Sequence, residues 1–325
     1  MDNKPLESSI NLVNKLKLEK GIKFDIVTEE DAIDLFNLRN NYFRLNSYLN
    51  NYEKHQQGEN KGKYINVDFA YLYEISKIDM YLRKIILGMC IDLEHSLKVW
   101  LLNHLLRNEN EDGYNIVFAF IQENPQVLNS IYGKSNSSYV KDIINTYFSF
   151  DRVYSDTNFR DQFPYIIQNC PIWVLVEVLS FGEFIKLFVF YINNYMYIRD
   201  VTEGIIMSIK DLRNACAHNN CILNNLGSSD TTPSTLVVRY VEQIDEIKKD
   251  SRSKRLKNRF VYSFVCLIYM FEYYVSFDIK NNSFKELKKF INGRMQRDIK
   301  YFKDNSLISS TFDFLKKIVD NLDVV

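Results

Sequence analysis

Residues 79–87, with the sequence DMYLRKIIL, lie at the centre of a long run of apolar residues at helical spacing. The run extends from Asp68 to about Leu106. A 3.6-residue repeat over this length predicts one long helix. Glu94 lies inside the predicted helix, where it can form a buried ion pair with Arg83.

The composition favours helices throughout the chain. The 325 residues include 10 Gly and 5 Pro, so turn signals are few, and the 46% hydrophobic content is ample for a core. The sequence contains no internal repeat, no heptad pattern and no set of alternating strands. We therefore predict an all-α protein, built as one large domain or two smaller ones.

Breaks in the apolar pattern divide the chain into three parts. Residues 1–60 are expected to form a small N-terminal helical module, which ends in a polar linker. A helical core follows at 64–278, with an irregular helical insertion at about 107–170. Residues 279–325 are expected to form a helical tail that is basic on one side. The basic residues of this tail are Lys288, Lys289, Arg294, Arg297 and Lys300.

Capping signals place several helix ends. Thr28, followed by three acidic residues, begins one predicted helix. Pro171 suits a first helical turn and begins another, whose core-facing residues include Trp173, Val176, Leu179 and Phe184. A further helix is predicted to end near residue 223. Residues 236–247 are either a short helix or briefly extended.

One apolar segment raises the question of a membrane. Residues 260–277 are apolar except for Ser263 and Glu272, and they follow a basic run, as a membrane anchor can. Glu272 would be costly in lipid, so a buried core helix is the better prediction. The five cysteines are scattered and form no disulfide framework, and the N-terminal sequence is not a signal peptide. We therefore expect a cytoplasmic protein with no membrane partner.

Arg213, Asn214 and His218 are the residues whose types suggest a specific chemistry. Metal-free RNA cleavage needs a cation for phosphate, an amide to orient a group and an imidazole to move a proton. At about 100° per residue, Asn214 and His218 share one helix face, while Arg213 points about 140° away from His218. A neighbouring helix or a second subunit must then complete the site. The alternative is a surface arginine and a histidine that only packs.

Contacts with RNA would have to come from local patches, because Lys+Arg and Asp+Glu balance at 41 each. The basic run at 248–259 either contacts RNA backbone or forms a solvated loop. Its basic residues are Lys248, Lys249, Arg252, Lys254, Arg255, Lys257 and Arg259. The stretch 41–48 is rich in aromatic and amide side chains. It either stacks on unpaired bases, with Tyr42 and Arg44 as RNA-binding candidates, or packs in the core.

Cys216, His218 and Cys221 raise the question of a metal site. A zinc site usually has four ligands at recognisable spacing, and no further Cys or His pair lies nearby in the sequence. We expect no metal and no cofactor, with Cys216 as a small core residue.

The motif at 213–218 has the form Arg-Asn-x-x-x-His at the end of an apolar helix, which is similar to the signature of HEPN ribonucleases. Further segments of interest are Leu18-Glu19-Lys20-Gly21, Asn41-Tyr42-Phe43-Arg44-Leu45-x-x-Tyr48, Asp79-x-x-Leu82-Arg83 with Ile91-x-x-Glu94, and Pro171-x-Trp173-x-x-x-Glu177-x-x-Ser180-Phe181-Gly182. In these segments, over about residues 12–220, the chain resembles the abortive-infection family of bacterial phage-defence proteins of the AbiD/AbiF type.

The resemblance implies a HEPN-like helical bundle with an RNA-directed activity that needs no metal. Arg213 and His218 would be catalytic, Asn214 would support them, and the ribose 2′-hydroxyl would be the nucleophile, so DNA should resist cleavage. It also implies RNA as the partner, in particular a small structured non-coding RNA. A homodimer would bring a second histidine to the site. The alternative is a catalytically idle protein that holds a specific structured RNA.

Overall fold

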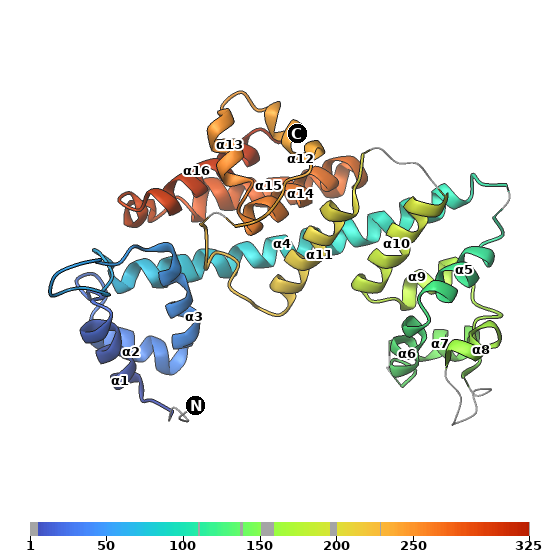
Figure 1. Cartoon of the computed structure of the whole chain (residues 1–325), viewed down its shortest axis with the longest axis horizontal. Coiled ribbons are helices and arrows are strands. Elements are labelled where there is room, and N and C mark those ends of the chain that lie inside the picture. The colour runs from blue at the N-terminus through green and yellow to red at the C-terminus, as the bar shows by residue number, and fades with distance from the viewer. Residues whose placement is uncertain are drawn as a thin grey trace. The chain divides into compact units, whose positions relative to one another are not determined.

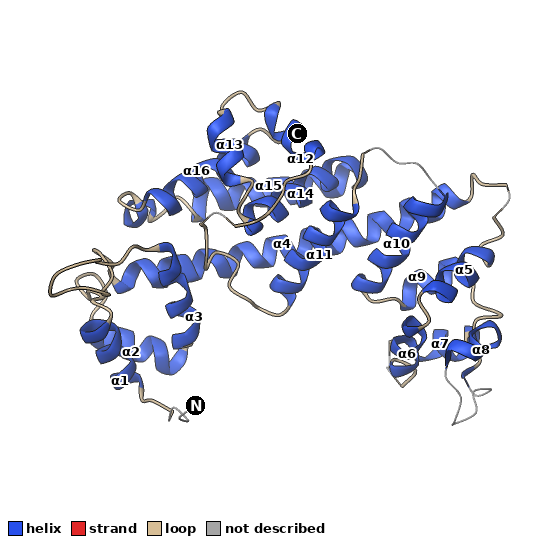
Figure 2. Ribbon diagram, viewed as in Figure 1, coloured by secondary structure: helices blue, strands red, loops and turns tan. Residues whose placement is uncertain are grey.

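The chain folds as an assembly of helices. The structure, a computed structural model, describes residues 6–109, 111–136, 139–150, 159–195, 200–227 and 229–324. Within these residues every named element is helical, and the only β-type pairings are two isolated bridges (Figure 2). The predicted all-α class is confirmed. Parts of the predicted insertion, residues 110, 137–138 and 151–158, lie outside the described residues.

The long central helix, α4, runs from Phe69 to Leu105 and confirms the helix predicted from residues 79–87 (Figure 1). Asp68 caps its first turn, because one carboxylate oxygen accepts a hydrogen bond from the backbone N–H of Ala70 at 2.8 Å. The other oxygen accepts from the backbone N–H of Asp25 at 2.8 Å. The cap therefore also ties the start of α4 to the N-terminal segment.

The backbone contacts divide the chain into two compact units. One unit comprises residues 1–90 and 211–325, and the other comprises residues 91–210. Helix α4 begins in the first unit and ends in the second. The first unit therefore includes both the predicted N-terminal module and the predicted C-terminal tail, which the sequence had suggested as separate parts.

The N-terminal helices of the first unit follow their capping signals. The hydroxyl oxygen of Thr28 accepts from the backbone N–H of Asp31 at 3.1 Å, as predicted, and begins α2. The side chain of Asn41 caps α3 in the same way, through the N–H of Phe43 at 2.7 Å. The helices here are α1 (Ser9–Asn14), a π-helical turn (Lys15–Glu19), α2 (Glu29–Leu38) and α3 (Tyr42–Ser47), followed by a short 3₁₀ helix (Tyr48–Asn51).

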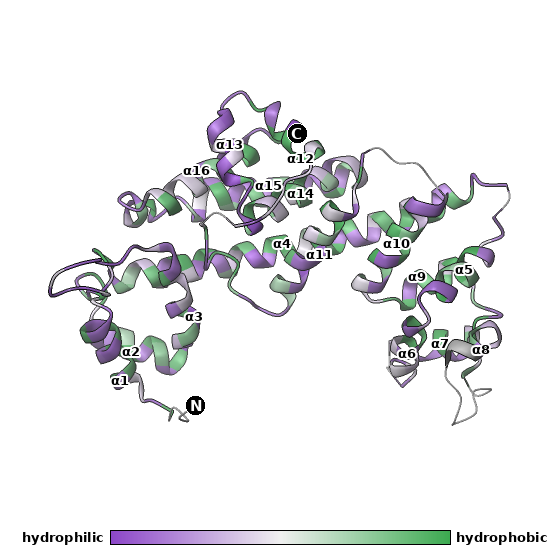
Figure 3. Cartoon of the chain, viewed as in Figure 1, coloured by the Kyte–Doolittle hydropathy of each residue, from purple (hydrophilic) through white to green (hydrophobic). Residues whose placement is uncertain are grey.

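The apolar segment at 260–277 forms α14 (Arg259–Tyr274), whose hydropathy is coloured in Figure 3. Its residues from Phe260 to Phe271 are all buried. Helices α12 (Thr235–Glu242) and α16 (Ser306–Asp320) pack against it. It is thus the core helix of this unit, as predicted, and the short helix at 236–247 is confirmed as α12. Across the residues that the structure describes, no helix is both long and apolar enough to span a membrane.

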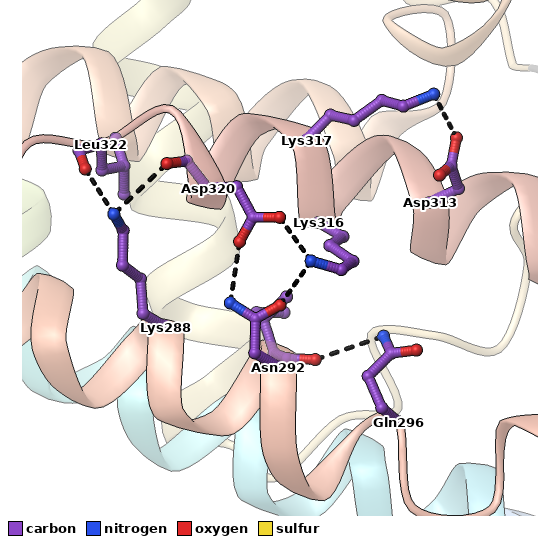
Figure 4. Close-up of polar contacts among 9 residues, drawn as sticks. Lys288, Asn292, Gln296, Asp313, Lys316, Lys317, Asp320 and Leu322 are labelled. Atoms are coloured by element: carbon purple, nitrogen blue, oxygen red, sulfur yellow. Dashed lines mark hydrogen bonds and ion pairs between the residues drawn. The ribbon is translucent and has the colours of Figure 1, made fainter. Parts of the chain in front are cut away.

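The C-terminal tail packs on itself through polar contacts between α15 (Phe277–Lys289), the turn after it, and α16 (Figure 4). Lys288 Nζ donates to the backbone carbonyl of Asp320 at 3.3 Å, and Asn292 Nδ2 donates to the Asp320 carboxylate at 2.7 Å. Arg294 forms an ion pair with Glu74 on α4. Two residues of the predicted basic face, Lys288 and Arg294, therefore hold the tail in place.

The second unit contains shorter helices: α5 (Asn115–Glu123), α6 (Gln126–Gly133), α7 (Lys141–Tyr147), α8 (Phe159–Ile166), α9 (Ile172–Val178) and α10 (Phe181–Tyr195). The helix predicted to begin at Pro171 and to include Leu179 and Phe184 is wrong as a single helix, because the chain breaks between α9 and α10. Trp173, which was expected to face the core, is 50% exposed. Ser180 and Glu183 form a capping box at the break. The Ser180 N–H donates to the Glu183 carboxylate at 2.7 Å, and the Glu183 N–H donates to the Ser180 hydroxyl at 3.4 Å.

Candidate functional site

The motif residues lie at the end of α11 (Glu203–Ala217), which stops earlier than the predicted end near residue 223. Asn219 has a left-handed backbone with φ of 57°, and its N–H donates to the Cys216 carbonyl at 3.1 Å. The N–H of Asn220 donates to the Ala215 carbonyl at 2.8 Å. This is a Schellman cap with asparagine in the usual glycine position. It leaves His218 exposed at the helix terminus.

Asn214 and His218 line one cavity of about 450 Å³, as expected of residues that share a helix face. Leu212, Ile222 and Phe260 give the cavity apolar walls. The residues after His218 and the start of α14 supply the rest of the lining. The end of α11 therefore forms part of a recess rather than a flat surface.

Arg213 lies outside the lining of this cavity. Its side chain is half-buried, and Nη1 donates to Asn214 Oδ1 at 3.3 Å. The guanidinium of Arg213 is thus adjacent to the Asn214 amide, which lines the cavity. Arg213 itself, unlike His218, is not part of the lining. Helix geometry predicts that Arg213 and His218 do not face the same cavity, and the structure agrees. A further group must therefore complete the site.

Arg259 is a cation that the cavity does contain. Its side chain is 74% exposed and forms an ion pair with Asp211 at 2.8 Å. Sequence reasoning assigned Arg259 only to the basic run, because 41 residues separate it from His218 and no spacing rule relates them. Only the packing of α14 beside the end of α11 brings this arginine to the motif.

Residues 219–227, the 219–227 loop, follow His218. The N-terminal helices hold it by two buried or half-buried side chains. Arg44 Nη2 donates to the Asn219 carbonyl. Asn51 Nδ2 donates to the Leu223 carbonyl, and Asn51 Oδ1 accepts from the N–H of Leu226, both at 2.8 Å. Asn51 therefore satisfies two backbone groups that would otherwise be buried without partners.

Helix α4 holds the same loop with a buried ion pair, Asp79 with Arg83. Asp79 Oδ2 accepts from the Leu223 N–H at 2.8 Å, and Arg83 Nη1 donates to the Asn220 carbonyl at 3.2 Å. The sequence suggested Glu94 as the partner of Arg83, and this is wrong. Glu94 pairs with Lys98 at 3.2 Å, whereas Asp79 lies one turn from Arg83 on the same helix face.

A third support comes from Asn258, which is buried at the start of α14. Its Nδ2 donates to the carbonyls of Asn225 and Gly227, at 3.0 and 2.6 Å. Its Oδ1 caps α14 through the Val261 N–H at 3.1 Å. The 219–227 loop is therefore fixed from three directions by side chains that are distant in the sequence.

Cys216 is buried beside the motif, and burial raises the pKa of its thiol to about 12. A thiol with that pKa is neutral at pH 7 and packs as a small apolar side chain. In the portion of the chain that is described, no three His, Cys, Asp or Glu side chains cluster in a way that could hold a metal ion.

The basic run divides into buried and exposed residues. Arg252, on α13 (Lys249–Arg255), pairs with Glu242 at 2.7 Å, and Arg255 donates to the hydroxyls of Thr311 and Ser310 at 2.7 and 2.6 Å. Both arginines are buried and hold α13 in place. The exposed candidates for RNA contact are Lys248, Lys249, Lys254, Lys257 and Arg259.

The aromatic stretch 41–48 divides in the same way. Tyr48 is fully buried, so it belongs to the core, and Arg44 is half-buried against the 219–227 loop. Tyr42 is half-buried, whereas Phe43 is 82% exposed. Tyr42 and Phe43 border a groove with Lys15 and Lys20. Burial, and then the nearby Lys54 and Lys15, lower the pKa of Lys20.

Comparison with known families assigns the chain to one of them. Residues 38–224 match the family described as Abi-like protein, which covers more than half of the chain. The protein therefore belongs to the Abi-like family. The matched region includes Arg44, Asn51, Asp79, Arg83 and the motif at 213–218, and it ends within the 219–227 loop. No curated protein and no solved structure matches the chain.

Proposed function

We propose that this Abi-like protein acts in abortive infection as a bacterial phage-defence ribonuclease, with a HEPN-type site at the end of α11. The observation that carries the proposal is the shared cavity of Asn214, His218 and Arg259. An imidazole, an amide and a guanidinium around one recess are the groups that metal-independent cleavage of RNA requires.

In this mechanism His218 takes the proton from the ribose 2′-hydroxyl, or gives one to the leaving 5′-oxygen. The 2′-oxygen attacks the adjacent phosphorus, so the products carry a 2′,3′-cyclic phosphate and a 5′-hydroxyl. Arg213 and Arg259 stabilise the negative charge that develops on the phosphate. Asn214, which accepts a hydrogen bond from Arg213 at 3.3 Å, orients that guanidinium or the phosphate.

One histidine cannot act as base and as acid on opposite sides of the same phosphate. A second copy of the chain, placed so that two ends of α11 face each other, supplies the other imidazole. It also supplies a second Arg213. The proposal therefore includes a symmetric homodimer as the active unit.

The first prediction concerns His218. Purified protein and the His218→Ala variant are incubated with labelled single-stranded RNA in excess chelator. We expect the variant to lose activity by about 100-fold or more, the usual effect of removing a general acid or base. His95→Ala is the matched control, because His95 is also an exposed histidine but lies within α4, away from the cavity lining. Its rate should equal that of the wild type.

The products and the substrate range complete this test. Cyclic phosphate ends and resistance of the corresponding DNA are expected, because DNA lacks the attacking hydroxyl. Equal cleavage by the wild type and His218→Ala would end the catalytic assignment. Cleavage that disappears with the chelator would replace the mechanism with a metal-dependent one.

A second function, a catalytically idle protein that holds a structured RNA, is supported by the groove around Tyr42 and Phe43. An exposed phenylalanine beside lysines suits stacking on unpaired bases. This function predicts a discrete RNA that co-purifies with the protein and dissociates with rising salt. Absence of both a bound RNA and salt-sensitive RNA binding in vitro would exclude it.

A further inference from the structure

The cavity beside His218 has a second polar side that the catalytic proposal does not use. The side chains of Asn220 and Asn224 line it. Within the described residues neither amide forms a hydrogen bond, although both lie beside backbone that is closely held. Each amide therefore offers one donor group and one acceptor to a molecule in the cavity.

Part of the cavity wall is apolar, although polar residues that include Asp211, Ser229 and Ser263 also line it. Leu212, Ile222 and Phe260 line it and are all buried. A volume of about 450 Å³ falls within the range of pockets that hold small organic ligands. Apolar walls beside side-chain amides match a flat ring system with donors and acceptors at its edge. Nucleobases have this chemistry.

Buried side chains from distant parts of the chain fix the backbone of the 219–227 loop. Asn51, Asp79 and Asn258 are all buried, and each uses its side chain to bind backbone groups of this loop. The amides of Asn220 and Asn224 are thus presented from a fixed backbone. A ligand that binds them does not lose affinity through the ordering of a loop, which is the advantage of a preorganised site.

We infer that this cavity is a nucleobase-binding pocket. The base lies against the wall formed by Ile222 and Phe260, and Asn220 and Asn224 hydrogen-bond its edge. Arg259 contacts the phosphate of the same nucleotide, in exchange for its exposed ion pair with Asp211. In combination with the proposed ribonuclease, on which this last step rests, the pocket selects the base beside the phosphate that is cleaved.

The pocket can be tested without any cleavage. The four nucleoside 3′-monophosphates contain no phosphodiester bond, so the intact wild-type protein can be titrated with each of them by calorimetry or NMR. We expect at least one to bind, with affinities that differ between bases. Asn224→Ala should weaken the best ligand by about tenfold, the effect of losing one ordinary hydrogen bond. Asn103→Ala, which removes an exposed amide from α4, is the control and should bind as the wild type does.

Two results would overturn the pocket. One is binding of ribose 5-phosphate as tightly as the best nucleotide, because it would show recognition of phosphate alone. The other is unchanged nucleotide affinity in Asn224→Ala and in Asn220→Ala. The ribonuclease proposal can fail independently of the pocket. If the wild-type protein binds nucleotides selectively but does not cut RNA, the pocket proposal stands and the ribonuclease proposal is wrong. If RNA is cut, the base preference at the cut should relax in Asn224→Ala, and an unchanged preference would count against the pocket.

Discussion

Asp79 and Arg83 show how single residues control this site from a distance. They lie one turn apart on α4, with side chains 0% and 4% exposed, and neither lines the cavity. Their ion pair neutralises two charges that would be unstable alone in the core. Their remaining hydrogen-bonding capacity goes to Leu223 and Asn220. The pair is therefore a positioning device for the 219–227 loop.

Asp79→Ala should accordingly be among the most destabilising substitutions in the chain. It leaves the Arg83 charge buried and the Leu223 N–H without its acceptor, and we expect a loss of about 3–5 kcal/mol in the free energy of unfolding. Urea denaturation followed by circular dichroism measures it. Asp313→Ala is a matched control, because Asp313 pairs with Lys317 at the same spacing on α16 but in solvent. If Asp79→Ala lowered the free energy of unfolding as little as Asp313→Ala does, the positioning role of Asp79 would be contradicted.

Helical spacing predicts only some of the side chains that meet at the motif. The shared face of Asn214 and His218 follows from their separation of four residues. The cation in their cavity, Arg259, does not follow from spacing at all. It reaches the cavity because the buried face of α14 fixes the start of that helix beside the end of α11.

At the scale of elements, the ends of helices were harder to predict than their existence. The helix predicted to end near residue 223 ends at Ala217, and Ile222 and Leu223 bury their side chains from a non-helical loop. Asn219 accepts the left-handed conformation that ends the helix. Between α9 and α10, the spacing of Ser180 and Glu183 was a readable capping signal.

Contacts between elements also predict how stability changes with pH. Glu74 on α4 is almost fully buried and contacts both Arg294 and Lys77. Burial by itself would raise the pKa of this carboxyl, but the hydrogen bonds from Arg294 and Lys77 outweigh it and hold the pKa below its ordinary value of 4.5. Because the folded-state pKa is lowered, this pair stabilises the fold above pH 4.5, and its contribution is lost as the pH falls through the folded-state pKa.

Glu74→Gln should thus be less stable than the wild type at pH 7, by about 3 kcal/mol, since it leaves Arg294 without its buried partner. The difference between the two proteins should shrink on acidification below pH 4.5. Urea denaturation at a series of pH values between neutrality and acid measures both quantities. A difference that stays constant over the series would show that the ion pair is not the cause.

At the scale of the whole molecule, the proposed active unit contains two chains. Arg213 lies outside the cavity that holds His218, so its proposed catalytic role is met most directly if it serves the cavity of a partner chain. In a twofold dimer each chain would then contribute its Arg213 and its His218 imidazole to the site that it shares with its partner.

Mixing of subunits tests this arrangement. His218→Ala is co-expressed with the wild type at equal levels. Because the proposed site needs an imidazole from each chain, a mixed dimer has no complete site. Only the quarter of randomly formed dimers that contain two wild-type chains should cut RNA, so about a quarter of the wild-type rate should remain. Gel filtration with light scattering gives the mass of the active species. A mixture that retains about half of the wild-type rate would show that each site is complete within one chain.

The sequence by itself determined the helical class, the long helix α4, the buried character of α14 and the common face of Asn214 and His218. These features depend on local periodicity and on caps, which are encoded within a few turns of the chain. The tertiary structure alone decided which buried polar residues meet. Arg44, Asn51, Asp79 and Asn258 lie up to 214 residues apart and converge on one loop. A buried polar group requires a partner, but any distant backbone group can satisfy that requirement, so only the packed fold identifies the partner.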